Sequence, residues 1–409
     1  MLGSSVALIC QITSRPFGTG RLATTPWVVM RMNELHSSNS QIIPSLDGIR
    51  AFAVLIVVLS HSYLGALIPG GLGVTIFFFL SGYLITNLLL AEHARTGKID
   101  ILKFYARRVF RLMPPLLISL AIAYGLTSAG LLPGGITLKG LAAQLLYFAN
   151  YYGIFLDPGN TVPDGTGILW SLAVEEHFYI FYPLLLSLLL ESTLRPRATG
   201  TVLGIGCLVI LAWRVHLVQA PDFVSVRTYY ASDTRIDSII YGCILAVVLN
   251  PARDRHRTDT MSLGQWALLA ISLGTLLLAL LYRATAFRET VRYSLQGLAL
   301  MPLFYFAVRF PGNWLFRSLN SSWAIKIGAY SYAIYLVHLI VINVIAANAT
   351  TLATKPFLLF PAALLISIAY AAAIDRFVDR YFRQLRRKYR PGSAPKLTRS
   401  IPEQSKATS

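Results

Sequence analysis

Charged side chains are scarce in this chain of 409 residues: Asp, Glu, Lys and Arg together make up only 13% of it. A typical soluble domain carries about 25% of such residues. Hydrophobic residues instead make up 55%, and many apolar runs reach the roughly 18 residues that a helix needs to cross a bilayer. This composition excludes an ordinary soluble domain and predicts an integral membrane protein with the lipid bilayer as its partner.

Cysteine is also sparse, with Cys10, Cys207 and Cys243 as its three examples. Their spacing matches neither a zinc site nor a disulfide framework, and the last two lie in apolar runs as small core residues. The sequence also lacks an internal repeat, a P-loop and the glycine pattern of a dinucleotide-binding fold. We therefore expect no metal site and no permanently bound cofactor.

Ten apolar segments have the length of transmembrane helices, which predicts an all-α fold, a polytopic membrane bundle of about ten helices. The predicted spans are 48–67, 73–91, 113–131, 168–190, 200–219, 234–250, 262–282, 292–308, 323–347 and 357–377.

The distribution of Lys and Arg orients this bundle, because cytoplasmic loops are enriched in basic residues. With the N-terminus in the cytoplasm, the inner loops and the C-terminal end hold 24 Lys and Arg residues, and the outer loops hold six. This asymmetry predicts that both termini are cytoplasmic. It also accounts for the net charge of +18 without nucleic acid as a partner, since no basic run is interleaved with aromatic residues on a soluble surface.

The two ends of the chain differ from its apolar middle. Residues 1–44 are largely polar and lack a signal-peptide core, so we expect a disordered N-terminal extension, with Met30 or Met32 as an alternative start. Residues 45–385 form the predicted membrane domain. Residues 386–409 form a basic tail that we expect to be disordered.

Arg50 and His61 are ionisable residues within the first apolar span. On a helix they share one stripe, about 16 Å apart, and Asp47 lies near that stripe one turn before Arg50. Ionisable groups in a membrane span usually face a cavity and mark function. The structural alternative is an Arg–Asp pair that only fixes helix packing.

Two later helices carry similar stripes. Ser171 and Glu175 share a face at the start of the fourth span, where the alternative role is capping of the helix dipole. Tyr335 and His338 lie on a stripe of the ninth span, where His338 is alternatively a packing residue. The predicted topology brings Glu175, His61 and His338 to a similar depth near the outer side.

Arg108 and Arg111 are three residues apart before Pro114 and Pro115, which are expected to begin the third span. A guanidinium pair matches the oxygens of a phosphate, so these residues are candidates for binding an anionic cytosolic substrate. Ordinary anchoring at the inner side is the alternative. In the second span, the small Ser81–Gly82 step allows another helix or a ligand to approach closely.

Five motifs in this order resemble those of the acyltransferase 3 family, integral-membrane O-acyltransferases, over roughly residues 44–385. They are Ser-Leu-Asp47-Gly-Ile-Arg50 with His61; Phe-Phe-Phe-Leu-Ser81-Gly82-Tyr83; the Arg108–Arg111 pair before Pro-Pro; Trp170-Ser171-Leu-Ala-Val-Glu175; and Ser331-Tyr-Ala-Ile-Tyr335-Leu-Val-His338. Two features depart from the family pattern: His177 stands where many members have Gln, and a late Glu-Arg/Lys-Pro pattern is reduced to Asp375-Arg.

The resemblance implies transfer of an acyl group, typically acetyl, from acetyl-CoA in the cytosol to a hydroxyl of a cell-envelope or exported saccharide or glycolipid, at the bacterial inner membrane. It implies His61 as the general base, aided by Glu175 and Arg50, with an acyl-histidine intermediate as the alternative to direct transfer. Arg50, Arg108 and Arg111 would bind the acyl-CoA donor. The candidates for contact with the substrates are Asp47, Ser81, Trp170, Ser171, Tyr335 and His338. A transporter or flippase is the alternative class, but the matched broken helices that it predicts are not found in the sequence.

Overall fold

A computed structural model describes residues 43–65, 68–157, 159–192, 194–253 and 260–389. These residues form helices and connecting loops, with a single isolated bridge between Gly134 and Pro163 and no strand in the part described. The predicted N-terminal extension and most of the predicted tail lie outside the described residues.

Each of the ten predicted spans coincides with a helix. The helices are α2 (Pro44–Leu59, continued by the π-helical η1, Ser60–Leu64), α3 (Gly70–Thr96), α4 (Ile101–Ser128), α7 (Trp170–Glu191), α8 (Pro196–Val218), α10 (Ser232–Val248), α11 (Leu263–Leu281), α13 (Val291–Arg309), α14 (Ser322–Asn348) and α16 (Pro356–Ala373). Within the described residues, eight helical segments are long and apolar enough to cross a membrane; α10, with 17 residues, and α13 fall outside that set.

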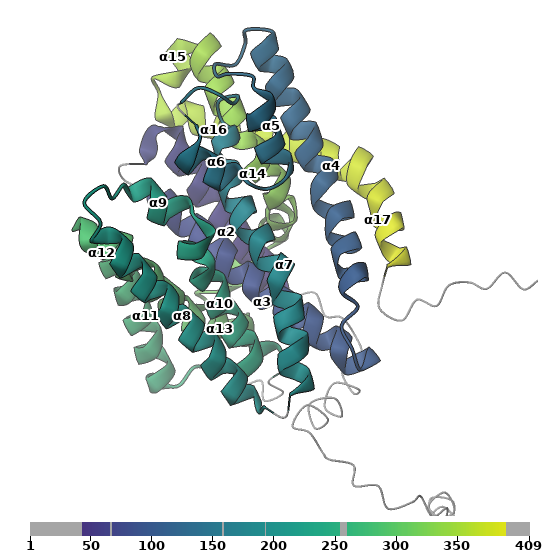
Figure 1. The fold of residues 1–409 in the computed structure, drawn as a ribbon, viewed down its shortest axis with the longest axis vertical. Coiled ribbons are helices and arrows are strands. Elements are labelled where there is room, and N and C mark those ends of the chain that lie inside the picture. Colours follow the sequence, from purple (N-terminus) through teal and green to yellow (C-terminus); the bar gives the residue numbers. More distant parts are fainter. Residues whose placement is uncertain (1–42, 66–67, 158, 193, 254–259, 390–409) are drawn as a thin grey trace, which may run out of the picture.

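Shorter helices connect these spans. They are α5 (Leu138–Leu145), α6 (Ala149–Phe155), η2 (Thr166–Leu169), α9 (Ser225–Tyr230), η3 (Pro251–Arg253), α12 (Thr285–Glu289), η4 (Arg317–Asn320) and α15 (Thr350–Ala353). Figure 1 shows α5 and α6 beside the upper part of the bundle and α9 above α8 and α10. The loop segments around α6, η2 and α9 therefore gather at one end of the central helices.

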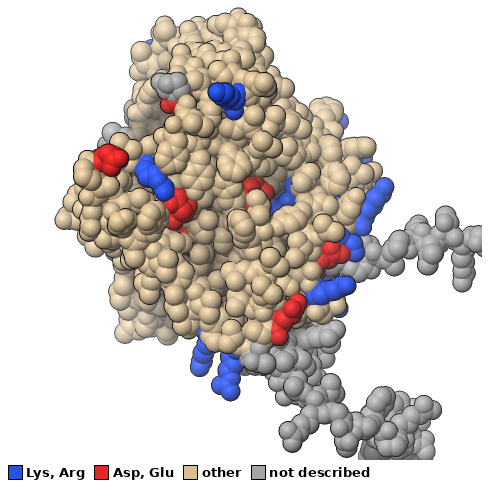
Figure 2. All heavy atoms as spheres, in the orientation of Figure 1, with Lys and Arg blue, Asp and Glu red and all other residues tan. Residues whose placement is uncertain are grey.

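The centre of the bundle is formed by α2, α3, α10 and α14, with α8, α11 and α13 on one side and α4 on the other (Figure 1). Large apolar side chains on the peripheral helices are exposed, among them Leu208 of α8 and Ile271 of α11. The face in Figure 2 is mostly uncharged, with charged side chains in a few small groups. Such a surface fits contact with lipid.

Glycines set the closest helix contacts at the centre. A Cβ atom on Gly82 of α3 would lie 2.0 Å from the backbone oxygen of Ile239 in α10, and one on Gly242 of α10 would lie 1.9 Å from that of Phe79 in α3. A side chain at either position would collide with backbone that cannot rotate away. The close approach expected at the Ser81–Gly82 step is therefore confirmed, and the approaching element is α10.

The prediction that Pro114 and Pro115 begin a helix is wrong, because α4 starts at Ile101 and continues through both prolines. The side chain of Asp100 caps its first turn by accepting from the backbone N–H of Lys103. Near the prolines, the Tyr332 hydroxyl donates to the backbone oxygen of Leu112 at 2.9 Å. Pro114 and Pro115 lack the N–H groups that would bond the backbone oxygens of Phe110 and Arg111, and membrane helices tolerate such internal prolines.

The last helix, α17 (Arg380–Lys388), follows α16 through the π-helical segment η5 (Ile374–Asp379) and packs on α4. The ring of Phe110 stacks with that of Phe382, and Arg107 donates to the backbone oxygen of Tyr389 at 2.8 Å. Helical structure thus reaches three residues into the segment that the sequence assigns to a tail.

Candidate active site

Two adjoining cavities lie inside the bundle and share two lining residues, Val74 of α3 and Tyr335 of α14. The histidine cavity, about 400 Å³, is lined by His61. The arginine cavity, about 830 Å³, is lined by Arg50, Arg108 and Arg111 among others. The candidate residues from the sequence are thus divided between two compartments.

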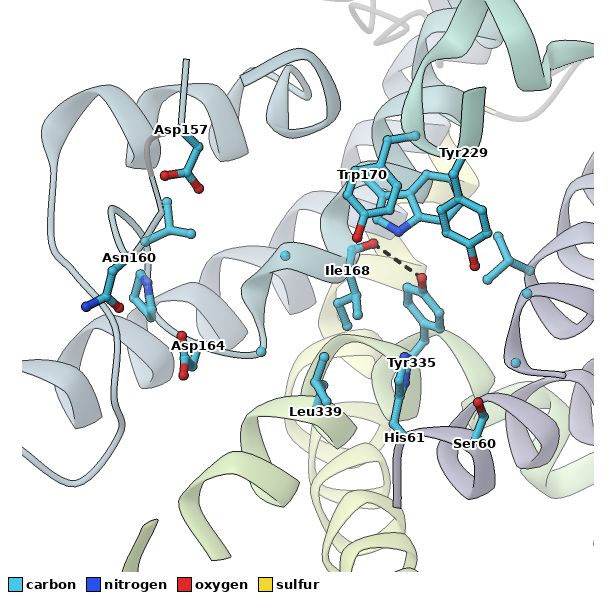
Figure 3. Close-up of a pocket in the computed structure, with 18 residues that line it drawn as sticks. Ser60, His61, Asp157, Asn160, Asp164, Ile168, Trp170, Tyr229, Tyr335 and Leu339 are labelled. Atoms are coloured by element: carbon cyan, nitrogen blue, oxygen red, sulfur yellow. Dashed lines mark hydrogen bonds between the residues drawn. The ribbon is translucent and has the colours of Figure 1, made fainter. Parts of the chain in front are cut away.

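The histidine cavity has an aromatic wall and an acidic wall, which face each other in Figure 3. Trp170, from the first turn of α7, stacks on Tyr230 with ring centroids 4.9 Å apart, and Tyr229 lies beside it. The opposite wall carries Asp157 and Asp164, which are both partly exposed. No Lys or Arg lies among the residues that line this cavity in the described part of the chain.

His61 lies where regular helix geometry breaks down. It belongs to the π-helical segment η1, in which Ser62 and Tyr63 have non-helical backbone angles and Tyr63 has a φ of 64°. Left-handed backbone at a non-glycine residue costs energy, and π-helical turns are frequent at functional sites. The half-buried imidazole lines the cavity instead of facing lipid (Figure 3).

His61 is hydrogen-bonded to His338 of α14, with 2.9 Å between Nδ1 of His61 and Nε2 of His338. Nδ1 of His338 lies 2.7 Å from the backbone oxygen of Tyr335. A carbonyl oxygen only accepts, so Nδ1 of His338 carries a proton, and Nε2 of the neutral ring is then the acceptor. His61 must therefore donate through Nδ1, which leaves its Nε2 unprotonated and able to accept a proton.

The expectation that Glu175 lies at the level of His61 is not met. Glu175 lines the arginine cavity, one helical turn further along α7 than Ser171, and the imidazole partner of His61 is His338. The Ser81 hydroxyl contacts the Tyr179 hydroxyl and also lies within hydrogen-bonding reach of the Glu175 carboxyl. Glu175, Ser81 and Tyr179 thus form a separate polar cluster in the arginine cavity.

The arginines of the second cavity are engaged to different degrees. Arg50 pairs with Asp47 at 3.0 Å, as their spacing predicted. Arg108 pairs with Glu176 at 2.5 Å, and its guanidinium lies 3.4 Å from the centre of the Tyr179 ring. Arg111 is exposed, and no hydrogen bond or ion pair to it is seen among the described residues. Arg111 is therefore the arginine best placed to receive an anionic group.

Ser171 and Tyr335 join the two cavities. The Ser171 hydroxyl, in the arginine cavity, lies 2.7 Å from the Tyr335 hydroxyl. Tyr335 also donates to the backbone oxygen of Ile168 at 3.2 Å, the contact drawn in Figure 3. Every candidate residue from the sequence thus lies on one of the two cavities, except His338, which is fully buried behind His61.

Several residues of these cavities were not anticipated. Tyr229, Asp157 and Asp164 lie on short helices and loops, where no apolar periodicity points to a position in space. Burial raises the pKa of the Tyr229 hydroxyl to about 12, so that it stays protonated as a hydrogen-bond donor. Arg95 of α3 also lines the arginine cavity. Its position, four helical turns beyond Ser81, places it on the same face of the helix, so the sequence could have indicated it.

No group of three or more His, Cys, Asp or Glu side chains within the described ranges is arranged to hold a metal ion.

Comparison with known proteins connects this arrangement to a family. The family model described as an acyltransferase domain matches residues 43–376. The O-acetyltransferase OatA of Staphylococcus aureus strain NCTC 8325 is 32% identical over 320 residues, which cover 75% of this chain and 51% of that protein. SACOL0978 of S. aureus strain COL, whose curated name gives O-acetyltransferase as a provisional activity, is 30% identical over 372 residues, which cover 87% and 60%.

The chain spans about half to three fifths of the length of these relatives. No solved structure matches it significantly. Because the family model covers most of the chain and contains all of the residues that line both cavities, the protein belongs to the acyltransferase 3 family of integral-membrane proteins.

Proposed function

We propose that the protein is a membrane O-acyltransferase that moves an acyl group, acetyl above all, from a cytosolic acyl-CoA to a hydroxyl of a cell-envelope or exported saccharide. The observation that carries this proposal is His61, which lines one cavity and is hydrogen-bonded to the buried His338, directly beside a second cavity lined by arginines. The proposed location is the bacterial cytoplasmic membrane, with both termini in the cytoplasm.

The arginine cavity suits the donor. Acyl-CoA carries phosphates at one end and a thioester at the other, and guanidinium groups bind phosphate oxygens in a fork. Arg111 and Arg95 are exposed, and Arg50 and Arg108 lie deeper in the same cavity. The basic loops and the C-terminal end favour the cytoplasm on this side of the bundle, where acyl-CoA is made.

The histidine cavity suits a saccharide acceptor. Trp170, Tyr229 and Tyr230 offer flat apolar faces on which a sugar ring can stack, and Asp157 and Asp164 offer carboxylate oxygens to its hydroxyl groups. A few polar groups that converge on an aromatic cavity are typical of a small-molecule site. The absence of basic residues among the described lining residues favours an uncharged sugar over an anionic one.

The chemistry follows from the tautomer of His61. Nε2 removes the proton of the acceptor hydroxyl as its oxygen attacks the thioester carbonyl; positioned bases of this kind contribute about 10²–10⁴-fold to the rate. When the new C–O bond has formed and the C–S bond breaks, the imidazolium returns that proton to the departing thiolate. His338 holds the ring of His61 in the reactive tautomer throughout.

The test is transfer of label from [¹⁴C]acetyl-CoA to envelope glycans by detergent-permeabilised membranes from a strain that lacks the chromosomal gene and carries a plasmid copy. His61→Ala should lower transfer at least about 100-fold at equal membrane abundance. The matched control is His216→Ala, because His216 of α8 stacks with Trp213 and lines neither cavity. Full activity of His61→Ala would refute the proposal, and so would an absence of transfer by the wild type, which the transporter alternative predicts.

A further inference from the structure

The two cavities meet at a thin septum that three helices cross at the same level. On α3, Gly70 and Gly71 line the histidine cavity, Val74 lines both cavities, and Phe77 lines the arginine cavity. Along this helix, the lining passes from the histidine cavity to the arginine cavity within two turns. Its inward face thus forms a continuous wall from one cavity to the other, with Val74 at the boundary.

The same change occurs on α14 and α7. On α14, Tyr332 lines the arginine cavity, Tyr335 lines both and Leu339 lines the histidine cavity. On α7 the boundary falls between two consecutive residues, Trp170 on the histidine side and Ser171 on the arginine side. One helical turn rises about 5.4 Å, so the septum is about one turn thick.

The septum is tightly packed and held by hydrogen bonds. Val74 and Tyr335 are each only 6% exposed. Two contacts fix the Tyr335 hydroxyl, one to Ser171 and one to the backbone oxygen of Ile168. The ring of Tyr335 also meets Phe77 edge-on, with centroids 6.1 Å apart. A rigid boundary of this kind admits a small group without rearrangement and obstructs a larger one.

We propose that Val74 and Tyr335 form a filter that limits the transferred group to a short acyl chain of two or three carbons. The inference rests on the proposed function, in which the thioester arrives through the arginine cavity and the hydroxyl through the histidine cavity. The acyl carbonyl must then enter the septum to reach His61, and the rest of the acyl chain must fit against the side chain of Val74. A fourth carbon would require the space that the Val74 methyl groups fill.

The filter is tested with Val74→Ala, which removes both methyl groups from the septum. The matched control is Val247→Ala on α10, a similarly buried valine that lines neither cavity. Permeabilised membranes with each variant receive acetyl-, propionyl- or butyryl-CoA. Ester-linked acyl groups on the envelope glycans are then released with alkali and quantified. A methylene group in an apolar pocket changes selectivity by about 10–200-fold.

We therefore expect wild type and Val247→Ala to transfer acetyl and propionyl far faster than butyryl, and Val74→Ala to raise the butyryl-to-acetyl ratio at least about tenfold. Val74→Leu, which adds bulk, should lower acetyl transfer and keeps the test informative if the alanine variant is poorly inserted. A wild type that transfers butyryl as readily as acetyl, or an unchanged ratio in Val74→Ala, overturns the filter alone. A wild type that uses none of the three thioesters overturns the proposed function itself.

Discussion

Replacement of His338 by Leu should leave the protein folded but slow acyl transfer, because His338 acts only through His61. The His338 ring is fully buried and accepts a hydrogen bond from Nδ1 of His61 at 2.9 Å. Leu fills a similar volume without an acceptor. His338→Gln is the matched control, since a glutamine side chain can place an oxygen close to the position of Nε2 and accept from the same N–H.

The expected magnitude follows from what the hydrogen bond does. A neutral hydrogen bond contributes about 0.5–1.5 kcal/mol, and its loss also allows His61 to adopt the tautomer in which Nε2 is protonated and cannot act as a base. Partners that orient a metal-binding imidazole through its second nitrogen are typically worth about 10–100-fold, and we take the same range for a general base. This range corresponds to about 1.4–2.7 kcal/mol of transition-state stabilisation. We expect a loss of 10–100-fold in kcat for His338→Leu and a smaller loss for His338→Gln.

The assay is steady-state transfer from labelled acetyl-CoA in permeabilised membranes, with the abundance of each variant measured by immunoblot. A residue that orients the base lowers kcat and leaves the KM for acyl-CoA unchanged, because donor binding takes place in the other cavity. Equal kcat values for His338→Leu and wild type would refute the tautomer argument. A change in KM without a change in kcat would assign His338 to substrate binding instead.

Two further predictions concern the arginine cavity and the packing of the bundle. The double variant Arg108→Ala with Arg111→Ala should raise the KM for acyl-CoA about tenfold or more, since each charged hydrogen bond contributes about 1.5–3 kcal/mol. The control is Arg197→Ala, because Arg197 lies outside both cavities. An unchanged KM in the double variant would reject the phosphate-binding role. Gly82→Ala should lower stability by about 1–3 kcal/mol because its Cβ meets backbone of α10. Gly274→Ala is the control and should not lower stability, because a Cβ at Gly274 meets nothing within 4 Å. Thermal unfolding in detergent compares the two variants. Equal melting temperatures would contradict the inference that Gly82 is required for the close contact with α10.

The helices were predictable from the sequence because the bilayer imposes a minimum apolar length, and all ten predicted spans contain a helix. The Arg50–Asp47 pair was predictable because residues three apart on a helix lie on the same face. The start of α4 was not predictable, because the prolines that suggested a boundary lie inside a helix that begins at Ile101, and membrane helices tolerate internal prolines.

The partner of His61 shows where sequence reasoning reaches its limit. Helical spacing fixes the face and height of a residue on its own helix, but not the offset between two helices. An error of one turn, about 5.4 Å, moves a side chain from one cavity to the other. Glu175 was misplaced in this way, whereas His338 was assigned to the level of His61 correctly. The loop residues Asp157 and Asp164 carry no such periodic signal at all.

The position of the histidine pair is a consequence of how α2 and α14 cross. A Cβ on Gly328 of α14 would lie 1.9 Å from the backbone oxygen of Asp47 in α2, so the two helices touch there without intervening side chains. From that contact both chains advance in the same direction to the hydrogen bond between His61 and His338. The two parallel helices therefore contribute residues to both cavities. Asp47, at the glycine contact, holds Arg50 in the arginine cavity, and the far ends of the same two helices set the tautomer of the base in the other.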